Sequence, residues 1–340
     1  MAGRNLAYDI LPGLSKAVTI PILCVGNITS GGTGKTPMVT FLARHYQSKG
    51  LRVAILSRGY GRKNRQNQVI VTAAVRTEML SPDEIGDEAL MLRQQLPEVT
   101  LVLDADRVRG AAAIVENDLS DLILMDDGFQ HRRLRRDFNL VIIDSQRLFG
   151  NCQSLPTGPL REAISSLKRA DAVIFNKFDQ RHPDFYSQAA TVLNHIAPNR
   201  LFCTGYNYHK FTQLTGGREK TLSEIKKDSP VCAVAGLANN DYFFTQLKTS
   251  GLELAAAVPF KDHHVYTRQN LIDLKKLCRE RPLLTTAKDA DKLRLQAAAT
   301  DENFMQNIWI AEIELKINNE SSFLDLLPKF ETGEKSGEKR

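Results

Sequence analysis

The sequence predicts a doubly wound, mostly parallel α/β sheet together with a second, smaller α/β domain. Three observations predict this fold: a glycine-rich loop between an apolar run and a helical stretch, further apolar runs that alternate with helical stretches, and a length of 340 residues. Continuous apolar runs suit parallel strands that are covered on both faces. Alternation with helices favours a doubly wound sheet, and this length favours two domains.

The expected elements follow the chain in order. Strands of the first domain are expected at 21–25, 53–56, 101–103, 122–125, 140–143 and 172–175. Helices are expected at 38–49, 89–95 and 239–248. Strands of the second domain are expected at 231–235, 254–258, 283–285 and 308–315. The domains are therefore expected as a P-loop core at 1–200, a smaller C-terminal α/β domain with linker strands at 201–320, and a segment with a charged tail at 321–340.

Residues 26–37 read GNITSGGTGKTP and have the strand–loop–helix setting of a phosphate-binding P-loop, which makes the fold P-loop NTPase-like. Lys35 is expected to reach the β- and γ-phosphates, and the Thr36 hydroxyl to bind Mg²⁺. Thr29 occupies the place of the usual first glycine, so the loop must rely on its other glycines. The expected nucleotide-binding residues are Thr29, Ser30, Gly31, Gly32, Thr33, Gly34, Lys35 and Thr36.

The apolar run at 122–125 ends in Asp126 and Asp127. A buried strand that delivers a carboxylate beside the phosphates is how P-loop enzymes hold Mg²⁺. If the strand continues, adjacent acids point to opposite faces, and only one of them binds the metal directly. Gln130 and His131 follow at once and are expected at the site, whereas Arg135 and Arg136 are expected on a solvated turn.

The composition of the chain limits the kinds of binding partner that we expect. The net charge of +6 and the pI near 9.0 suit an anionic ligand or an anionic membrane surface. Because no nucleic-acid-binding motif is present, no nucleic-acid partner is expected. The scattered cysteines suit a reducing cytosol. We find no secretory signal and no apolar run that could span a bilayer, although Leu6, Tyr8, Ile10, Leu11 and Leu14 form either a short interfacial anchor or a surface-packed segment.

Other interpretations remain open from the residues alone. Residues 176–179 read NKFD, which matches the guanine-recognition pattern of GTPases, although the switch register after Asp126 fails. A P-loop GTPase or GTP-dependent metallochaperone is therefore an alternative, and a protein that only binds nucleotide is another. By spacing alone, Asp87 and Glu88 are typical of a first helical turn, and His263 with His264 is typical of a structural pair.

A series of stretches in fixed order resembles the tetraacyldisaccharide 4′-kinase family of lipid A biosynthesis. They are VGNITSGGTGKTP at 25–37, SRGYG at 57–61, GDE at 86–88, DDGFQHR at 126–132, PLRE at 159–162, FKDH at 260–263 and KD at 288–289. Each stretch is short, but together they are specific.

The resemblance implies a kinase that uses ATP and Mg²⁺ to phosphorylate the 4′-hydroxyl of a tetraacylated glucosamine disaccharide 1-phosphate, forming lipid IVA. It implies Asp87 as general base with His263 as its helper, and Lys35 and Asp127 in catalysis. The implied metal ligands are Thr36, Asp126 and Asp127. The expected substrate contacts are Arg58, Glu88, Gln130 and His131, with Arg62 and Arg107 as further cations for the 1-phosphate.

The same resemblance implies an acylated lipid substrate and peripheral attachment to the cytoplasmic face of the bacterial inner membrane, with no transmembrane helix. Members of the family usually carry a longer apolar N-terminal segment than this chain does. No obligate protein partner is expected.

Overall fold

The computed structural model describes residues 8, 10–64, 66–178, 183–296 and 301–330. The chain folds into two compact units, Met1–Thr204 with Ile317–Arg340, and Gly205–Lys316. The charged tail expected at 331–340 lies outside the described residues.

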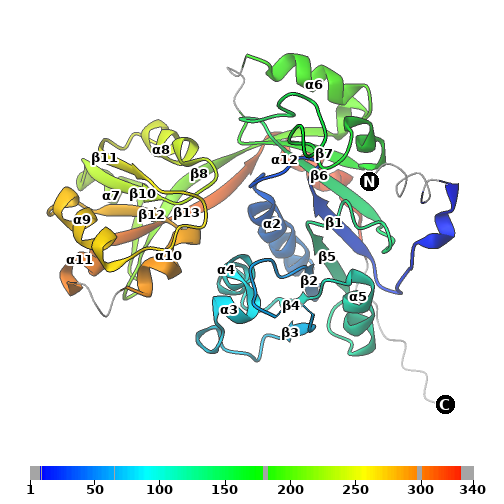
Figure 1. The fold of residues 1–340 in the computed structure, drawn as a ribbon, viewed down its shortest axis with the longest axis horizontal. Coiled ribbons are helices and arrows are strands. Elements are labelled where there is room, and N and C mark those ends of the chain that lie inside the picture. The colour runs from blue at the N-terminus through cyan, green and yellow to red at the C-terminus, as the bar shows by residue number, and fades with distance from the viewer. Residues whose placement is uncertain (1–7, 9, 65, 179–182, 297–300, 331–340) are drawn as a thin grey trace. The chain divides into compact units, whose positions relative to one another are not determined.

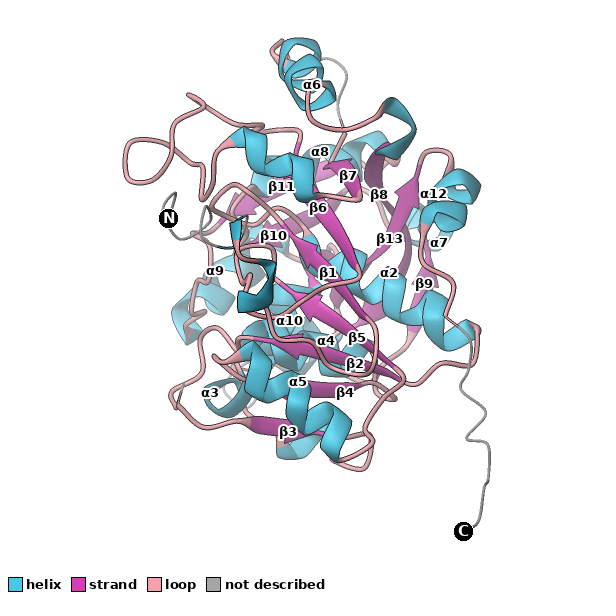
Figure 2. Cartoon of the chain, turned by 90° about the vertical axis from the view of Figure 1, so that its right-hand side faces the viewer, coloured by secondary structure: helices cyan, strands magenta, loops and turns pink. Residues whose placement is uncertain are grey.

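The first unit is built on a mostly parallel sheet, as predicted. Its strands are β1 (Ile22–Gly26), β2 (Val53–Ser57), β3 (Val69–Val71), β4 (Thr100–Leu103), β5 (Leu122–Asp126), β6 (Phe138–Asp144), β7 (Ala172–Asn176) and the start of β8 (Leu201–Gln213). Their order is β8-β7-β6-β1-β5-β2-β4-β3, which can be followed in Figure 2. Among these described strands, β3 alone pairs antiparallel with its neighbour, β4.

Helices cover both faces of this sheet. They are α2 (Lys35–Ser48), α3 (Pro82–Ile85), α4 (Asp87–Gln95), α5 (Arg107–Glu116), α6 (Phe185–Leu193) and α12 (Glu320–Leu326). Ala111 and Ile114 of α5 join a buried cluster with alternate residues of β1, β2 and β5. The helix α2 packs against the same three strands on the other face (Figure 1). Burial on both faces explains why these strands are continuous apolar runs.

The second unit is a smaller α/β unit. Its strands are β9 (Glu219–Thr221), β10 (Val231–Ala235), β11 (Leu254–Pro259), β12 (Leu283–Thr286) and β13 (Ile308–Ile317), in the order β11-β10-β12-β13-β8 with β9 on β8. Its helices are α7 (Leu222–Lys227), α8 (Asn240–Thr249), α9 (Arg268–Cys278), α10 (Ala287–Arg294) and α11 (Glu302–Gln306). The strands β8 and β13 belong to both units, since each crosses a unit boundary.

Every predicted strand is present, and no strand end differs from its expected position by more than two residues. The strands β3, β8 and β9 were not predicted. Buried and half-buried residues are mixed along β8, whose sequence LFCTGYNYHKFTQ holds no continuous apolar run. The strand β9 reads EKT and lacks any apolar signal.

This order brings four strand ends together. The strands β7, β6, β1 and β5 are consecutive neighbours and parallel, so their carboxyl ends lie at one edge of the sheet. These ends carry Gly26, Asp126, Asp144 and Asn176. In open parallel sheets, ligands bind at this edge, beside the point where the strand order reverses.

A first prediction concerns Gly86, which joins α3 to α4. Its φ is 89°, and a Cβ built there would lie 2.3 Å from the carbonyl oxygen of Tyr60. Gly86→Ala should therefore destabilise the protein by about 2–4 kcal/mol, through backbone strain and the clash together. Urea unfolding measures this loss. The matched control is Gly205→Ala, because a Cβ at Gly205 meets nothing within 4 Å; equal stability of the two variants would contradict the prediction.

Candidate active site

The loop after β1 has the backbone of an anion-binding nest. Gly31 and Gly34 adopt positive φ of 101° and 83°, which glycine tolerates best. Gly34 is the N-cap residue of α2, and no side chain there accepts a hydrogen bond from the first amides of the helix. Free amides at a helix N-terminus, together with the helix dipole, favour a bound phosphate. The loop therefore fits the polyphosphate that the sequence predicts there.

Thr29 departs from the usual glycine because the loop begins as paired, extended backbone. Thr29 forms an antiparallel bridge with Leu160. The amide of Ser30 donates to the carbonyl of Pro159 at 2.7 Å, and the amide of Arg161 donates to the carbonyl of Ile28 at 2.7 Å. A residue in such a pairing needs no left-handed backbone, so a threonine fits.

Asp126 is the last residue of β5 and lies buried. Its Oδ1 has no hydrogen-bond partner among the described residues. Burial raises the pKa of this carboxyl to about 7, partly opposed by the positive charge of Lys35 and reinforced by the negative charges of Asp127 and Glu88. A buried carboxylate oxygen without a donor is the kind of group that a cation satisfies.

Asp127 leaves the strand. The strand β5 ends at Asp126, and Asp127 has a φ of 50°, so the alternation of faces expected for a continuing strand does not apply here. Lys35 Nζ lies 3.3 Å from Asp127 Oδ1, and a nitrogen of Arg161 lies 2.9 Å from both carboxylate oxygens. Burial acts to raise the pKa of Asp127, but Lys35 and Arg161 outweigh it, so the pKa is lowered.

These residues fit a magnesium–nucleotide ligand. Mg²⁺ in such sites takes one or two carboxylates and completes its shell with phosphate oxygens and water. Asp126 supplies a carboxylate oxygen that no described residue satisfies, at the edge of the sheet. Thr36, the second residue of α2, follows the lysine that binds Asp127. Asp126, Asp127 and Thr36 would hold the ion.

Gln130 and His131 follow Asp126 and Asp127 closely in the chain. The amide Nε2 of Gln130 donates to the carbonyl of Asn27 at 2.7 Å, so this side chain supports the start of the loop. Burial, with a contribution from the charge of Arg107, lowers the pKa of His131 to about 4. The imidazole is therefore neutral at physiological pH.

The helix α4 brings two acids to the same edge. Asp87 and Glu88 are its first two residues, with Gly86 at the N-cap position. Asp87 is half-buried and Glu88 is exposed. Because Glu88 contributes to the raised pKa of Asp126, the start of α4 lies within electrostatic reach of that carboxyl group.

The three arginines expected to bind the substrate differ in their burial and in their hydrogen bonds. Arg107 is buried, donates to the carbonyl of Asp104 at 2.6 Å and interacts electrostatically with both Asp126 and Asp127. Arg58 follows β2 and is exposed. Arg62 is buried and donates to the carbonyl of Leu103 at 3.1 Å.

Two arginines differ from expectation. Arg161 was given no role from the sequence, although it lies in the PLRE stretch, because its pairing with Asp127 joins positions 34 residues apart. Arg136 was expected on a solvated turn. It is half-buried and donates to the carbonyl of His131 at 2.9 Å and to Asn139 at 3.0 Å, so that expectation was wrong.

His263 belongs to the second unit and follows β11. It is exposed, with a φ of 57°. Lys288 Nζ, on α10, lies 2.6 Å from Asp262 Oδ1 and 3.4 Å from His263 Nε2. The side chains of Asp262, His263 and Lys288 therefore form one polar cluster.

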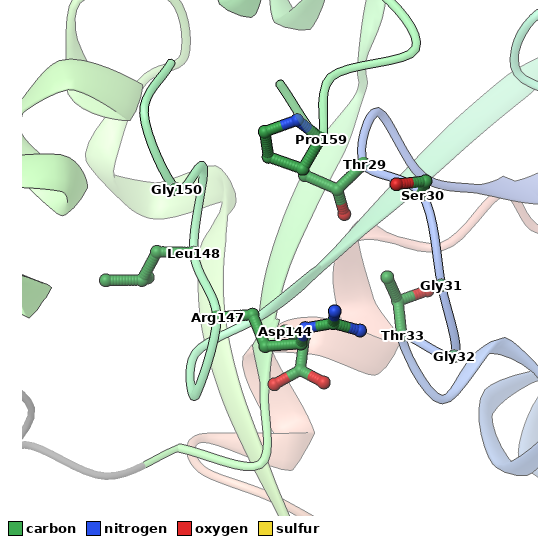
Figure 3. A pocket seen from close by; sticks show the side chains of 10 residues that line it. All are labelled: Thr29, Ser30, Gly31, Gly32, Thr33, Asp144, Arg147, Leu148, Gly150 and Pro159. Carbon is green, nitrogen blue, oxygen red and sulfur yellow. The ribbon is translucent and has the colours of Figure 1, made fainter. Parts of the chain in front are cut away.

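A pocket opens on the outer side of the phosphate loop. Figure 3 shows it between the loop and the segment after β6, with the side chains of Asp144 and Arg147 beside Gly31 and Thr33. The remaining lining residues are Thr29, Ser30, Gly32, Leu148, Gly150 and Pro159. The lining therefore joins the phosphate loop to the segment after β6.

A second prediction concerns His131. Its folded pKa of about 4 lies below the ordinary value of 6.5. The unfolded chain therefore binds a proton more readily between these values, and the folded protein loses stability as the pH falls through this window. His131→Gln should remove that contribution. Relative to the variant, the wild type should lose about 1 kcal/mol between pH 7 and pH 5, a figure discounted for partial exposure of the ring. Urea unfolding at several pH values measures the difference; a constant difference would contradict the assignment.

Comparisons with known proteins agree on one family. The model of the tetraacyldisaccharide-1-P 4′-kinase family matches residues 1–331. A tetraacyldisaccharide 4′-kinase of Pseudomonas entomophila is 40% identical over 280 residues, covering 82% of this chain and 75% of the relative. One of Syntrophus aciditrophicus is 34% identical over 340 residues, covering 95% and 87%.

A crystal structure of LpxK from Aquifex aeolicus in complex with ATP has a TM-score of 0.72 to this chain at 28% identity, covering 96% of this chain and 93% of the other. The resemblance read from the motifs is thereby confirmed, and the kinase is favoured over the GTPase or metallochaperone. The chain belongs to the tetraacyldisaccharide-1-phosphate 4′-kinase family and is a phosphotransferase.

Proposed function

We propose that this protein transfers the γ-phosphate of ATP to the 4′-hydroxyl of a tetraacylated glucosamine disaccharide 1-phosphate, forming lipid IVA. The observation that carries the proposal is the edge where β1 and β5 end. There a phosphate loop with uncapped helix amides lies beside a buried carboxylate oxygen of Asp126 that no described residue satisfies. The family of this chain has this acceptor in its name.

In this proposal Asp87 is the general base. A sugar hydroxyl is a weak nucleophile, and a carboxylate within hydrogen-bond reach takes its proton as the O–P bond forms. The hydroxyl oxygen attacks the γ-phosphorus, the bond to the β–γ bridging oxygen breaks, and ADP leaves with that electron pair. Asp87 suits this role because it begins the helix α4, whose first turn interacts electrostatically with Asp126.

Charge neutralisation does most of the remaining work in phosphoryl transfer. Lys35 lies where it can reach the terminal phosphates while it offsets the charge of Asp127. Mg²⁺, when bound by Asp126, Asp127 and Thr36, would neutralise charge on the β- and γ-phosphates. We propose that the substrate is contacted by Arg58, Glu88, Gln130 and His131. The assignment is supported by their places in the chain, because Arg58 follows β2, Glu88 lies in the first turn of α4, and Gln130 and His131 follow the end of β5.

For His263 we propose the role of catalytic helper to the base. The proposal rests on the FKDH stretch and on the side chains around the imidazole. Lys288 binds Asp262 and contacts His263 Nε2, so two charged groups define the environment of the ring. A histidine with such neighbours can hold or pass a proton.

A third prediction tests the function and the base together. Purified protein receives radiolabelled ATP, Mg²⁺ and detergent-solubilised tetraacyldisaccharide 1-phosphate. Label should appear in the lipid, and Asp87→Asn should slow transfer by about 10²–10⁴-fold with the Kd for ATP within about twofold of the wild type. Lys35→Ala should lose both transfer and ATP affinity.

The matched control is Asp83→Asn, because Asp83 is an exposed acid on the neighbouring helix α3 that pairs with Lys63. It should leave transfer unchanged. Transfer by Asp87→Asn at the wild-type rate would overturn the role of the base. Nucleotide hydrolysis without lipid labelling would overturn the acceptor. A preference for GTP over ATP would restore the GTPase alternative.

We further propose that the protein works at the cytoplasmic face of the inner membrane. None of the helices in the described part of the chain is long and apolar enough to cross a bilayer. Ile10, Leu11 and Leu14 expose 66%, 56% and 46% of their surfaces. The adjoining residues are tied to a basic segment, because the amide of Lys16 donates to the carbonyl of Arg133 at 2.7 Å. Apolar side chains beside cations suit the surface of an anionic bilayer.

A fourth prediction follows for membrane binding. Vesicles that contain phosphatidylglycerol should sediment the wild type, and the triple variant Ile10→Ser, Leu11→Ser, Leu14→Ser should bind about tenfold or more weakly, since each apolar side chain contributes by its buried area. Added salt should weaken binding because it screens the cations. The control is Tyr186→Ser with Leu193→Ser, which are also exposed apolar residues of this unit. Equal losses in both variants would contradict a localised binding surface.

A further inference from the structure

Two side chains at the end of β7 hold the backbone of the phosphate loop from its outer side. Lys177 Nζ donates to the carbonyl of Gly32 at 3.2 Å, and Asn176 Nδ2 donates to the carbonyl of Thr33 at 2.8 Å. These are consecutive carbonyls in the middle of the loop. The NKFD stretch, which suggested guanine recognition, therefore directs its first two side chains to the protein backbone.

The direction of these carbonyls sets the direction of the next amides. In a trans peptide the C=O and the following N–H point in opposite directions. Holding the carbonyls of Gly32 and Thr33 toward β7 turns the N–H groups of Thr33 and Gly34 to the other side. Positive φ at Gly31 and Gly34 supports the same arrangement. Successive amides that point to one side make an anion-binding nest.

Both donors are themselves held in place. Lys177 Nζ lies 2.6 Å from Asp144 Oδ2, and their side chains are only 11% and 3% exposed. The hydroxyl of Thr204 donates to Asn176 Oδ1 at 2.8 Å, which leaves the NH₂ group of Asn176 directed at the loop. The hydroxyl of Ser145 donates to the carbonyl of Asn176 at 2.5 Å. A buried ion pair with further hydrogen bonds has a fixed geometry.

We propose that Asn176 and Lys177 are positioning residues for ATP: they orient the amides of the phosphate loop and thereby determine affinity for the phosphates. Asp144 holds the Lys177 ammonium in place. Figure 3 shows Asp144 across the pocket from Thr33 and Gly32, with the side chain of Arg147 between them. The inference rests on the assignment of the loop at 26–37 to the phosphates of ATP.

The test separates phosphate affinity from stability. Lys177→Met should weaken ATP binding about tenfold or more, as expected for loss of a charged hydrogen bond, and change adenosine binding less than about twofold. Asn176→Leu should show the same selectivity, although it removes no charge. Isothermal titration with ATP, and adenosine competition against a fluorescent ATP analogue, measure both.

A double variant distinguishes positioning from a structural role. Lys177→Met alone leaves Asp144 buried without its cation, so it should also lower stability. Adding Asp144→Asn removes that charge and should restore the urea midpoint, but ATP affinity should stay low, because the carbonyl of Gly32 still lacks its ammonium. Recovery of ATP affinity together with stability would overturn the proposal.

The matched control is Arg109→Met. Arg109 pairs with the buried Asp104 at 2.7 Å, after β4, which β5 and β2 separate from β1, so this variant also removes the paired cation of a buried carboxylate. It should lower stability and leave ATP affinity unchanged. Equal losses of ATP and adenosine affinity in Lys177→Met would also overturn the proposal. Unchanged ATP affinity in Lys35→Ala would instead contradict the assignment of residues 26–37 to the phosphates of ATP. The two experiments therefore distinguish failure of the positioning proposal from failure of the loop assignment.

Discussion

The site depends on how two adjacent carboxylates are kept at the end of a buried strand. Asp126 has a raised pKa and an oxygen that no described residue satisfies, whereas Asp127 is ionised between Lys35 and Arg161. Like charges so close to a low-dielectric interior need opposite charges nearby. Lys35 begins α2, and Arg161 belongs to the segment that pairs with the start of the phosphate loop. The two cations that neutralise Asp127 therefore connect the end of β5 with the phosphate loop and with α2.

The other side of the loop is built on the same principle. The ion pair of Asp144 and Lys177 joins the ends of β6 and β7 and reaches the loop through a carbonyl oxygen. The phosphate loop is thus connected to two charged groups, Asp127 with Lys35 and Arg161, and Asp144 with Lys177, whose members come from distant parts of the chain. Groups that are oriented before the ligand arrives need no reorganisation during the reaction, which is how electrostatic stabilisation becomes effective.

Sequence reasoning succeeded where the signal is local. The runs at β1, β2 and β5 are apolar because helices cover both faces, and this burial is readable without any knowledge of partners. It failed for β8, whose residues alternate irregularly between buried and half-buried surroundings. Asn176 and Lys177 match a base-recognition pattern that was kept only as an alternative, and both side chains donate to the backbone of the phosphate loop. A short pattern specifies residue types but not their partners.

The sequence by itself determined the fold class, the P-loop and the family, because each depends on residues close together along the chain or on their order. Only the tertiary structure decided which charges meet: Arg161 with Asp127, Lys177 with Asp144 and Gly32, and Glu88 near Asp126. The physical reason is that sheet order places neighbouring strand ends together from distant positions in the chain. Electrostatic interactions depend on that distance in space, and no local pattern records it.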